Sequence, residues 1–547
     1  MTPVLKRLFK LVFASITASG LIACQPSQAP SGLVYCSEGN PESFNPQLVT
    51  SGTTLDATSH QIYDHLVEYD TATGNIRPAL ATSWTISPDG KQYTFILREN
   101  VSFHHSELFT QTRNFDSSDV LFSFNRVIDQ NNPYHFLSRN GYPFFQSIDF
   151  AKLVKSIELP TANKVVFNLN RSDASFLANM ASDSAVILSK EYADHLLQAG
   201  MPQKLDLDAI GTGPFQLKQY TKNEYIRYLR NDNYWGDRPH IQNLVFDITR
   251  KSSQRLAKLI TGDCNVSALP KPSEIKVVEQ NNHIELQQQN GMNVSYWAFN
   301  TQKPPFNNVK VRQAIAMAIN KKDILHTVYN DTAREAKGIL PPASWSHSSA
   351  IEEISFSPSR ARRILETEGI QNLEIDLWTM PTARAYNPNP IKTAQLIQAD
   401  LTRINVKVNI INYDWSVFIH KLNSTSYDSV LIGWTADNSD PDNFFSPFLS
   451  CASLKSNNNR SKWCSKSFDA LLQRAKSTQQ QSERRILYQQ AETIIEKQKP
   501  IVTLAHSNRM VLKRSDISGI DLTPFGGISF AKAKHVQNIN EQKKGTQ

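Results

Sequence analysis

The sequence predicts an α/β protein whose main sheet is mostly parallel, with helical crossovers. The first observation is that helix-like and strand-like segments alternate along the second half of the chain, as is typical of parallel strands joined by helices. The second is length, because 547 residues exceed what one hydrophobic core usually organises. We therefore expect two or three domains of ordinary globular composition, given 40% apolar and 20% charged residues.

The elements of the first part of the chain are expected from the spacing of apolar residues. Strands are expected at residues 94–98 and 164–169, and helices at residues 118–129 and 309–320. In the last of these helices the apolar side chains share one face and basic side chains lie elsewhere. This pattern favours a scaffold helix that packs on a sheet.

Helix and strand then alternate along the chain. A helix is expected from Ser357 to Glu368, because Pro358 fits its first turn and Gly369 ends it. The expected order downstream is strand 373–379, helix 392–404, strand 406–412, helix 416–422 and strand 429–434. Ligands collect beyond the carboxyl ends of such strands. The loops after the first and last of these strands are thus the expected ligand site.

The N-terminus has the layout of a bacterial export signal. Basic residues precede an apolar stretch at residues 11–20. Residues 21–24 (LIAC) resemble the lipobox of bacterial lipoproteins, which would make Cys24 the acylated first residue of the mature chain. An ordinary signal with an incidental cysteine is the alternative. Residues 25–31 are polar and contain proline, so we expect them to be an extended tether.

The rest of the chain is expected to be soluble. No other segment reaches the roughly 18 uninterrupted apolar residues that a membrane span needs. The formal charge of +8 includes three positive residues of the export signal, so the mature protein is only mildly basic. No run of lysine or arginine is long enough to follow a phosphate backbone. Nucleic acid is therefore not an expected partner.

Four cysteines remain once Cys24 is set aside: Cys36, Cys264, Cys451 and Cys464. An even number fits disulfides in an oxidising compartment, and three pairings are possible. The last two enclose a short polar loop, so a local bridge is the economical choice and leaves the first two to pair. A bridge between Cys36 and Cys264 would close a long loop. By constraining the unfolded chain it would stabilise the fold by nominally about 4 to 5 kcal/mol. A metal site is the rival, but there is no CxxC and no cysteine near a histidine pair.

Common catalytic signatures do not occur in the sequence. There is no HExxH and no GxxxxGK[ST], and residues 211–214 (GTGP) lack the third glycine of a dinucleotide loop. Residues 527–531 (GISFA) imitate a hydrolase elbow, but too few residues follow to supply the rest of a triad. His104, His105 and Glu107 are badly placed for one metal, since neighbours on a strand point to opposite faces. We expect no enzyme, no cofactor and no metal.

An acidic segment follows the last predicted strand. Residues 436–443 (ADNSDPDN) carry three carboxylates, but the glycine and the closing glutamate of a calcium loop are missing. A carboxylate here, such as Asp437, could instead hold an ammonium group, helped by an aromatic ring such as Trp434 that excludes water.

A matching cation lies in residues 380–388 (MPTARAYNP), which follow strand 373–379. Arg384 can bind a carboxylate through two hydrogen bonds, and Tyr386 offers a flat ring and a hydroxyl. One anionic and one cationic loop suit a zwitterion. The alternative is that both charges are solvated surface groups.

Seven stretches carry a family resemblance: residues 33–39, 44–46, 80–104, 211–215, 234–235, 311–314 and 433–434. On these stretches the chain resembles the family 5 extracellular solute-binding proteins, which include dipeptide-, oligopeptide- and haem-binding proteins. The resemblance spans nearly the whole mature chain. It implies a periplasmic-binding-protein type II clamshell with two lobes, an extra subdomain and a hinge of crossing strands, and the disulfide pairing argued above.

The resemblance also implies the domain boundaries. After the signal (1–24) and the tether (25–31), lobe I would comprise residues 31–290 with an extra subdomain at about 65–205. Lobe II would comprise residues 291–507, and residues 508–540 would return to lobe I. The hinge strands would be 293–300 and 501–506.

The implied function is that of a lipid-anchored, monomeric binding protein of a peptide ABC importer. It would capture short, dipeptide-like peptides in the periplasm and deliver them to an inner-membrane permease. In the dipeptide-binding members, the residues matching Asp437 and Arg384 bind the ammonium and carboxylate ends of the peptide. The peptide backbone would pair with a strand edge near Gly433.

The resemblance also implies two residues of the opposite cleft wall and leaves two alternative ligands. Gly52 and Thr53 would lie on the opposite cleft wall, although a turn without ligand contact is equally expected there. Residues 339–345 and 392–400 look more like the Sap branch, which is linked to antimicrobial-peptide resistance. Binding of antimicrobial peptides is thus one alternative, and binding of haem or glutathione on the same fold is the other.

Overall fold

The computed structural model describes residues 32–138, 141–423, 427–455 and 458–536. The predicted export signal, Cys24 and the tether lie outside the described residues. Within the described part of the chain, no helix combines the length and the apolar character needed to cross a membrane.

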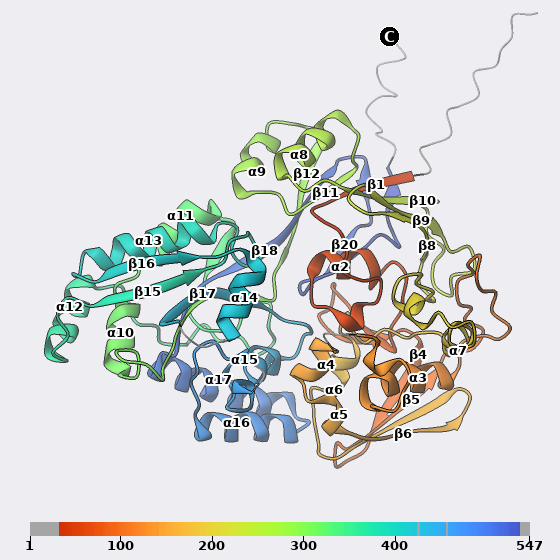
Figure 1. Ribbon diagram of the computed structural model, residues 1–547, viewed down its shortest axis with the longest axis horizontal. Coiled ribbons are helices and arrows are strands. Elements are labelled where there is room, and N and C mark those ends of the chain that lie inside the picture. The colour runs from red at the N-terminus through yellow and green to blue at the C-terminus, as the bar shows by residue number, and fades with distance from the viewer. Residues whose placement is uncertain (1–31, 139–140, 424–426, 456–457, 537–547) are drawn as a thin grey trace, which may run out of the picture. The chain divides into compact units, whose positions relative to one another are not determined.

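Twelve of the described strands form one mixed sheet in two groups that share β18 (Figure 1). The first group is β1 (Gly32–Ser37), β8 (Phe215–Thr221), β9 (Tyr225–Arg230), β10 (Asn243–Ile248), β11 (Val266–Ala268) and β12 (Ile284–Asn290). The second group is β13 (Asn293–Phe299), β14 (Ala333–Glu335), β15 (Glu374–Thr379), β16 (Lys407–Asn412) and β17 (Ser429–Thr435). The shared strand, β18 (Ile501–Arg514), pairs with strands of both groups.

The partners of β18 change between Ser507 and Asn508. Up to Ser507 the strand pairs with β13 and β14, and from Asn508 it pairs with β12 and then also with β11. The other connection between the groups runs from β12 to β13 through Gly291. A Cβ on Gly291 would lie 2.4 Å from the carbonyl oxygen of Ser507. The two connections therefore cross so closely that a side chain has no room there.

Separate apolar cores lie on the two sides of this crossing. One core is formed by residues between Leu33 and Ala268 together with residues between Val511 and Ala533. Two further clusters are formed by residues between Met292 and Ala505. Each group of strands thus has its own apolar interior.

The first core carries an antiparallel four-stranded sheet: β4 (Ala81–Ile86), β5 (Gln92–Leu97), β7 (Lys164–Leu169) and β6 (Val154–Thr161). Its helices are α2 (Gly52–Thr58), α3 (Ser117–Ile128), α4 (Pro143–Ser147), α5 (Phe150–Leu153), α6 (Phe176–Met180), α7 (Lys190–Gln198), α8 (Ser252–Thr261) and α9 (Pro272–Val278). Short two-stranded ladders join β2 (Val67–Tyr69) to β3 (Ile76–Pro78), β19 (Ile517–Ser518) to β22 (Lys534–His535), and β20 (Asp521–Leu522) to β21 (Ile528–Ser529).

The second group of strands is covered by α10 (Val309–Met317), α11 (Lys321–Tyr329), α12 (Pro358–Thr367), α13 (Pro390–Thr402), α14 (Trp415–Asn423), α15 (Ser446–Leu449), α16 (Lys466–Ser477) and α17 (Gln481–Gln498) (Figure 1). The predicted alternation of helix and strand is confirmed here. Pro358 stands in the first turn of α12, and Gly369 follows its end with φ +70°.

The prediction of a mostly parallel sheet is wrong. β15 pairs in parallel with β16 and β17, and β1 with β10 and β11, but the remaining pairings of the large sheet are antiparallel. The physical reason is that β12, β13 and β18 are connecting strands. β12 and β13 run from the first core to the second and β18 runs back, so β18 pairs antiparallel with both. The successive strands β8, β9 and β10 also pair antiparallel.

Both predicted disulfides are present. Cys36 of β1 is joined to Cys264 just before β11, and Cys451 is joined to Cys464. The first bridge links two parallel neighbours within the first group of strands. The second closes a 13-residue separation in the second half of the chain.

Candidate functional site

The two charged loops predicted from sequence follow neighbouring parallel strands. β15 and β17 pair through Thr379 and Leu431, so β17 continues past the last residue of β15. The residues after β15 include Arg384, and those after β17 include Asp437. Because both strands end at the same edge of the sheet, the sheet carries both loops on one side.

Asp437 is the one carboxylate of the acidic loop 436–443 that has no cation partner among the described residues. Asp440 forms a buried ion pair with Arg484 at 2.8 Å, and Asp442 pairs with Lys476 at 2.9 Å. No described lysine, arginine or histidine nitrogen lies within 4 Å of the Asp437 carboxylate. Asp440 and Asp442 are therefore engaged in ion pairs within the fold, whereas Asp437 has no cation partner among the described residues.

Asp437 lies beside Asn443 and is sheltered from water. Its backbone N–H donates to Asn443 Oδ1 at 3.0 Å, and the Trp434 indole N–H donates to the same oxygen at 3.2 Å. Burial raises the pKa of Asp437 to about 7, although Asn443 hydrogen-bonds the carboxylate and opposes the shift. A cation beside Asp437 would stabilise the ionised form that burial disfavours.

Arg384 is presented by a tight turn, residues 384–387. The Arg384 N–H donates to the Asn387 carbonyl at 2.9 Å, and the Asn387 N–H donates back to the Arg384 carbonyl at 3.0 Å. The Arg384 side chain is exposed. A guanidinium displayed in this way is able to meet a carboxylate with two N–H groups.

Tyr386, in the same turn, lies flat against β17. A Cβ built on Gly433 would come within 2.2 Å of its ring, so the ring occupies the space of a residue-433 side chain. Its hydroxyl contacts the Met380 sulfur at 3.3 Å, and burial raises the pKa of Tyr386 to about 12. Gly433 is therefore required for this close approach, and the turn packs directly on the strand that leads to Asp437.

The structure brings five of the predicted residues together: Arg384, Tyr386, Gly433, Trp434 and Asp437. The other two, Gly52 and Thr53, lie in the first turn of α2, on the first core. The Thr53 hydroxyl donates to Glu38, and no atom lies within 4 Å of a Cβ built on Gly52. Thr53 is thus hydrogen-bonded to the residue that follows β1, and the space beside Gly52 is unoccupied by protein atoms.

Sequence reasoning missed two residues of the first core that bear on Asp437. The Asp183 carboxylate helps to raise the pKa of Asp437, so it lies near the acidic loop. His60 pairs with Asp183 at 2.7 Å, and this carboxylate raises the pKa of His60 to about 9 against the effect of burial. The two residues are far apart in sequence and belong to no local motif, so no signal could have found the pair.

A second missed contact joins the acidic loop to the first core. Asn438 donates to Asn179 of α6 at 2.8 Å, and both side chains are buried. A polar hollow of about 430 Å³ lies beside this contact. Its lining includes Asn438, Asp442, Asn443, Asn179 and Lys476.

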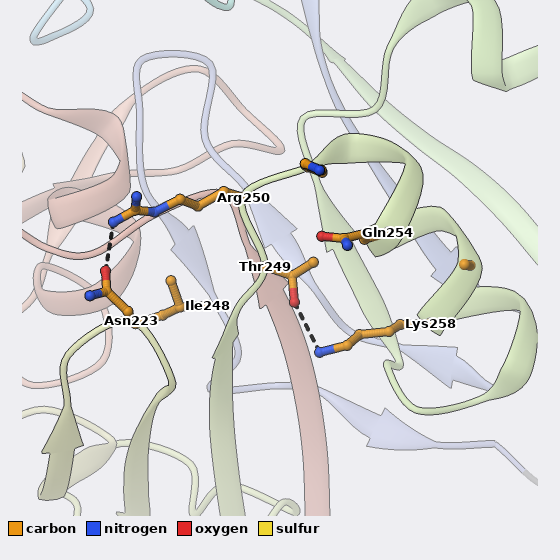
Figure 2. A pocket seen from close by; sticks show the side chains of 8 residues that line it. Asn223, Ile248, Thr249, Arg250, Gln254 and Lys258 are labelled. Atoms are coloured by element: carbon orange, nitrogen blue, oxygen red, sulfur yellow. Dashed lines mark hydrogen bonds between the residues drawn. The ribbon is translucent and has the colours of Figure 1, made fainter.

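A larger hollow, of about 730 Å³, lies where β10 ends and α8 begins (Figure 2). Arg250 donates to Asn223 there at 2.6 Å, and Lys258 donates to Thr249 at 2.9 Å and to Asp247 at 2.7 Å. The side chains of Asn223, Thr249, Arg250 and Lys258 in its lining are thus engaged in hydrogen bonds. None of the predicted ligand residues lines it.

Two sequence motifs set aside earlier have structural roles. Cβ atoms on Gly211 and Gly213 would lie 2.0 Å and 2.6 Å from the backbone of Ile62, so this glycine turn packs against the chain. His104 is buried, with its Nε2 2.8 Å from the Gly213 carbonyl oxygen. It therefore interacts with the backbone of the glycine turn.

The chain is similar to known transport proteins. The family described as “Bacterial extracellular solute-binding proteins, family 5 Middle” matches residues 75–456. The dipeptide-binding protein of Escherichia coli (strain K12) is 43% identical over 509 residues, which cover 93% of this chain and 94% of that protein. The peptide transport periplasmic protein SapA of Salmonella typhimurium is 39% identical over 535 residues, covering 95% and 97%.

A solved structure matches over a similar length. The dipeptide-binding protein from Pseudoalteromonas sp. SM9913, in complex with Met-Leu, has a TM-score of 0.85 and 42% identity. The match covers 92% of this chain and 100% of that chain.

Proposed function

Because the chain belongs to family 5 of the bacterial extracellular solute-binding proteins, we propose that it captures short peptides with free ends and delivers them to an ABC permease. The family is one of transport proteins, and the fold is that of type II periplasmic peptide-binding proteins, as the sequence predicted. The observation that carries the proposal is the charge pattern of the site. Asp437 alone lacks a cation among the described carboxylates of its loop, and Arg384 is exposed in the neighbouring turn.

In this proposal the peptide ammonium binds Asp437 and the terminal carboxylate binds Arg384. Tyr386 and Trp434 supply apolar walls beside the two charges, which strengthens both ion pairs by excluding water. Pairing of the peptide backbone with β17 near Gly433 would add main-chain hydrogen bonds without sequence specificity. Recognition of both ends selects for length, and the side chains are left to looser contacts.

We further propose that the two cores close on the peptide about the crossing of β12, β13 and β18. Lobe I would comprise residues 31–290 and 508–540, with the extra subdomain at about 65–205, and lobe II residues 291–507. The change of β18 partners between Ser507 and Asn508 supports this division. Gly52 and Thr53 would then form part of the opposite wall, and Asp183 would approach the ammonium end.

The proposed location is the periplasm, where Cys24 would anchor a monomeric protein to a membrane. Acylation of Cys24 would hold the mature chain at the membrane, beside a permease. Replacing Cys24 by serine should release the mature protein into the soluble periplasmic fraction. Retention of the Cys24→Ser protein at the membrane would contradict the anchor.

The proposal is tested by calorimetric titration of refolded, ligand-free mature protein with a dipeptide, its C-terminally amidated form and haem. We expect the free dipeptide to bind most tightly, and Arg384→Ala to remove the preference for the free carboxyl end. Arg474→Ala, which changes an exposed arginine on α16, is the matched control and should bind like wild type. Preference for haem, or for long basic peptides of the antimicrobial class, would overturn the dipeptide assignment.

A further inference from the structure

The turn that presents Arg384 is held by two hydroxyls from different elements. The Ser507 hydroxyl of β18 donates to the Ala385 carbonyl at 2.5 Å. The Tyr329 hydroxyl of α11 donates to the Tyr386 carbonyl at 2.8 Å. The carbonyl oxygens of the two central residues of the turn are thus both held by hydrogen bonds, and the Arg384 side chain is exposed.

Ser507 is itself the residue at which β18 changes partners. Its N–H donates to Asn293 Oδ1 at 3.0 Å, and the Asn293 amide donates back to the Ser507 carbonyl at 2.9 Å. The Asn293 carbonyl is 2.7 Å from His506 Nδ1. Asn293 is fully buried and Ser507 is 4% exposed. The backbone of Ser507 is therefore fixed at the crossing on both sides, and only its hydroxyl reaches the Arg384 turn.

The Ser507 hydroxyl has one hydrogen and two acceptors within reach. Asn293 Oδ1 lies 3.2 Å away, whereas the Ala385 carbonyl lies 2.5 Å away. The shorter contact takes the hydrogen. Asn293 Oδ1 still accepts a hydrogen bond from the Ser507 N–H. The hydroxyl bond to Ala385 therefore leaves no hydrogen-bonding group at the crossing without a partner.

We propose that Ser507 is a positioning residue that couples carboxylate recognition by Arg384 to the crossing of the two cores. This inference rests on the proposed function, in which Arg384 binds the peptide carboxylate. An exposed arginine loses considerable rotamer freedom when it grips a ligand, so a fixed backbone beneath it improves binding. Because Ser507 lies at the crossing, a change in geometry there reaches the Arg384 turn through a single hydrogen bond.

Tyr329 provides the internal comparison. It holds the neighbouring carbonyl from α11, and its hydroxyl also interacts with Ser295 of β13, but among the described residues it makes no hydrogen bond to Asn293 or Ser507. Tyr329→Phe should therefore loosen the turn without uncoupling it from the crossing.

The test compares Ser507→Val with Ser507→Thr. The two introduced side chains have the same shape, but only the second keeps a hydroxyl. The ligands are a free dipeptide and its C-terminal amide. We expect Ser507→Val to weaken binding of the free dipeptide about tenfold, the effect of one lost hydrogen bond. Binding of the amidated dipeptide should be unchanged, and Ser507→Thr should retain the wild-type preference. In an Arg384→Ala background, Ser507→Val should have no further effect, because both changes act on the same contact.

A scattering measurement tests the coupling itself. Addition of the free dipeptide should reduce the radius of gyration of wild type and of Tyr329→Phe, and less so that of Ser507→Val. Equal weakening of the free and amidated ligands in Ser507→Val would show a merely structural role and overturn the inference. If wild type already binds both ligands equally, the proposed role of Arg384 fails, and this inference falls with it. A wild-type preference that Ser507→Val leaves intact overturns the inference alone.

Discussion

The acidic loop 436–443 and the arginine turn 384–387 follow neighbouring strands, yet they are fixed by different forces. The loop is held by buried ion pairs of Asp440 with Arg484 and of Asp442 with Lys476. The turn is held by neutral hydrogen bonds to its carbonyls and by the packing of Tyr386 on Gly433. Breaking an ion pair of the loop should therefore cost more stability than loosening the turn.

The largest effect is expected from breaking an ion pair of the loop. Asp440→Ala leaves Arg484 buried without its carboxylate, which should lower the free energy of unfolding by about 3 to 5 kcal/mol. Denaturant titration measures this loss. Asp437→Ala is the control, and it should not lower the unfolding free energy, because Asp437 has no cation partner among the described residues and burial disfavours its ionised form. Equal losses in the two variants would erase the distinction between paired and open carboxylates.

The next effect falls on binding rather than on stability. Asp437→Asn should weaken dipeptide binding by about 2 to 5 kcal/mol, because the ammonium would lose its counter-charge in a site sheltered from water. Calorimetry with the dipeptide and its N-acetylated form measures this change. Acetylation should abolish the difference between wild type and variant. A variant that binds the free dipeptide as tightly as wild type would remove Asp437 from the site.

Packing of the turn on β17 can be tested by Gly433→Ala. The added Cβ would lie 2.2 Å from the Tyr386 ring, so it should displace the turn and cost about 1 to 3 kcal/mol in stability. The preference for a free carboxyl end should fall with it. Tyr386→Ala in the same protein makes room for the new methyl group and should restore part of the stability. No restoration would mean that the strain lies elsewhere on β17.

The last expected effect is a pH dependence of dipeptide binding that depends on Asp437 of the loop. The pKa of Asp437 is raised to about 7, so the carboxyl is protonated below that pH in the ligand-free protein. Dipeptide affinity should therefore rise as the pH increases from 5 to 7, by at most about tenfold per unit, until the peptide amine loses its charge near pH 8. Asp437→Asn should remove the rise. A wild-type affinity that is constant over this range would contradict the raised pKa.

The stability of the ligand-free protein should change with pH in the direction opposite to the dipeptide affinity. Because the folded pKa of Asp437 lies above the ordinary value of 3.8, its stabilising contribution is fully present below about pH 4. It is lost as the pH rises toward 7, where the buried carboxyl must ionise. Ligand-free protein and complex should thus respond to pH in opposite directions.

The sequence alone predicted the local elements, both disulfides and the two charged loops. Local spacing fixes a helix such as α12, since Pro358 and Gly369 act on their own turns. The short separation of Cys451 and Cys464 likewise predicted the loop that their disulfide closes. Chemistry carried by single side chains, such as the guanidinium of Arg384, is equally visible in sequence.

Tertiary structure alone decided which charges are open and how the two cores are joined. Asp437, Asp440 and Asp442 look alike in sequence, and only the approach of α16 and α17 neutralises the latter two. The antiparallel course of β18 and the contact of Ser507 with Ala385 depend on pairing between distant segments. The physical reason is that helices and turns form within a few residues, whereas ion pairs and sheet pairings are set by which segments meet on folding.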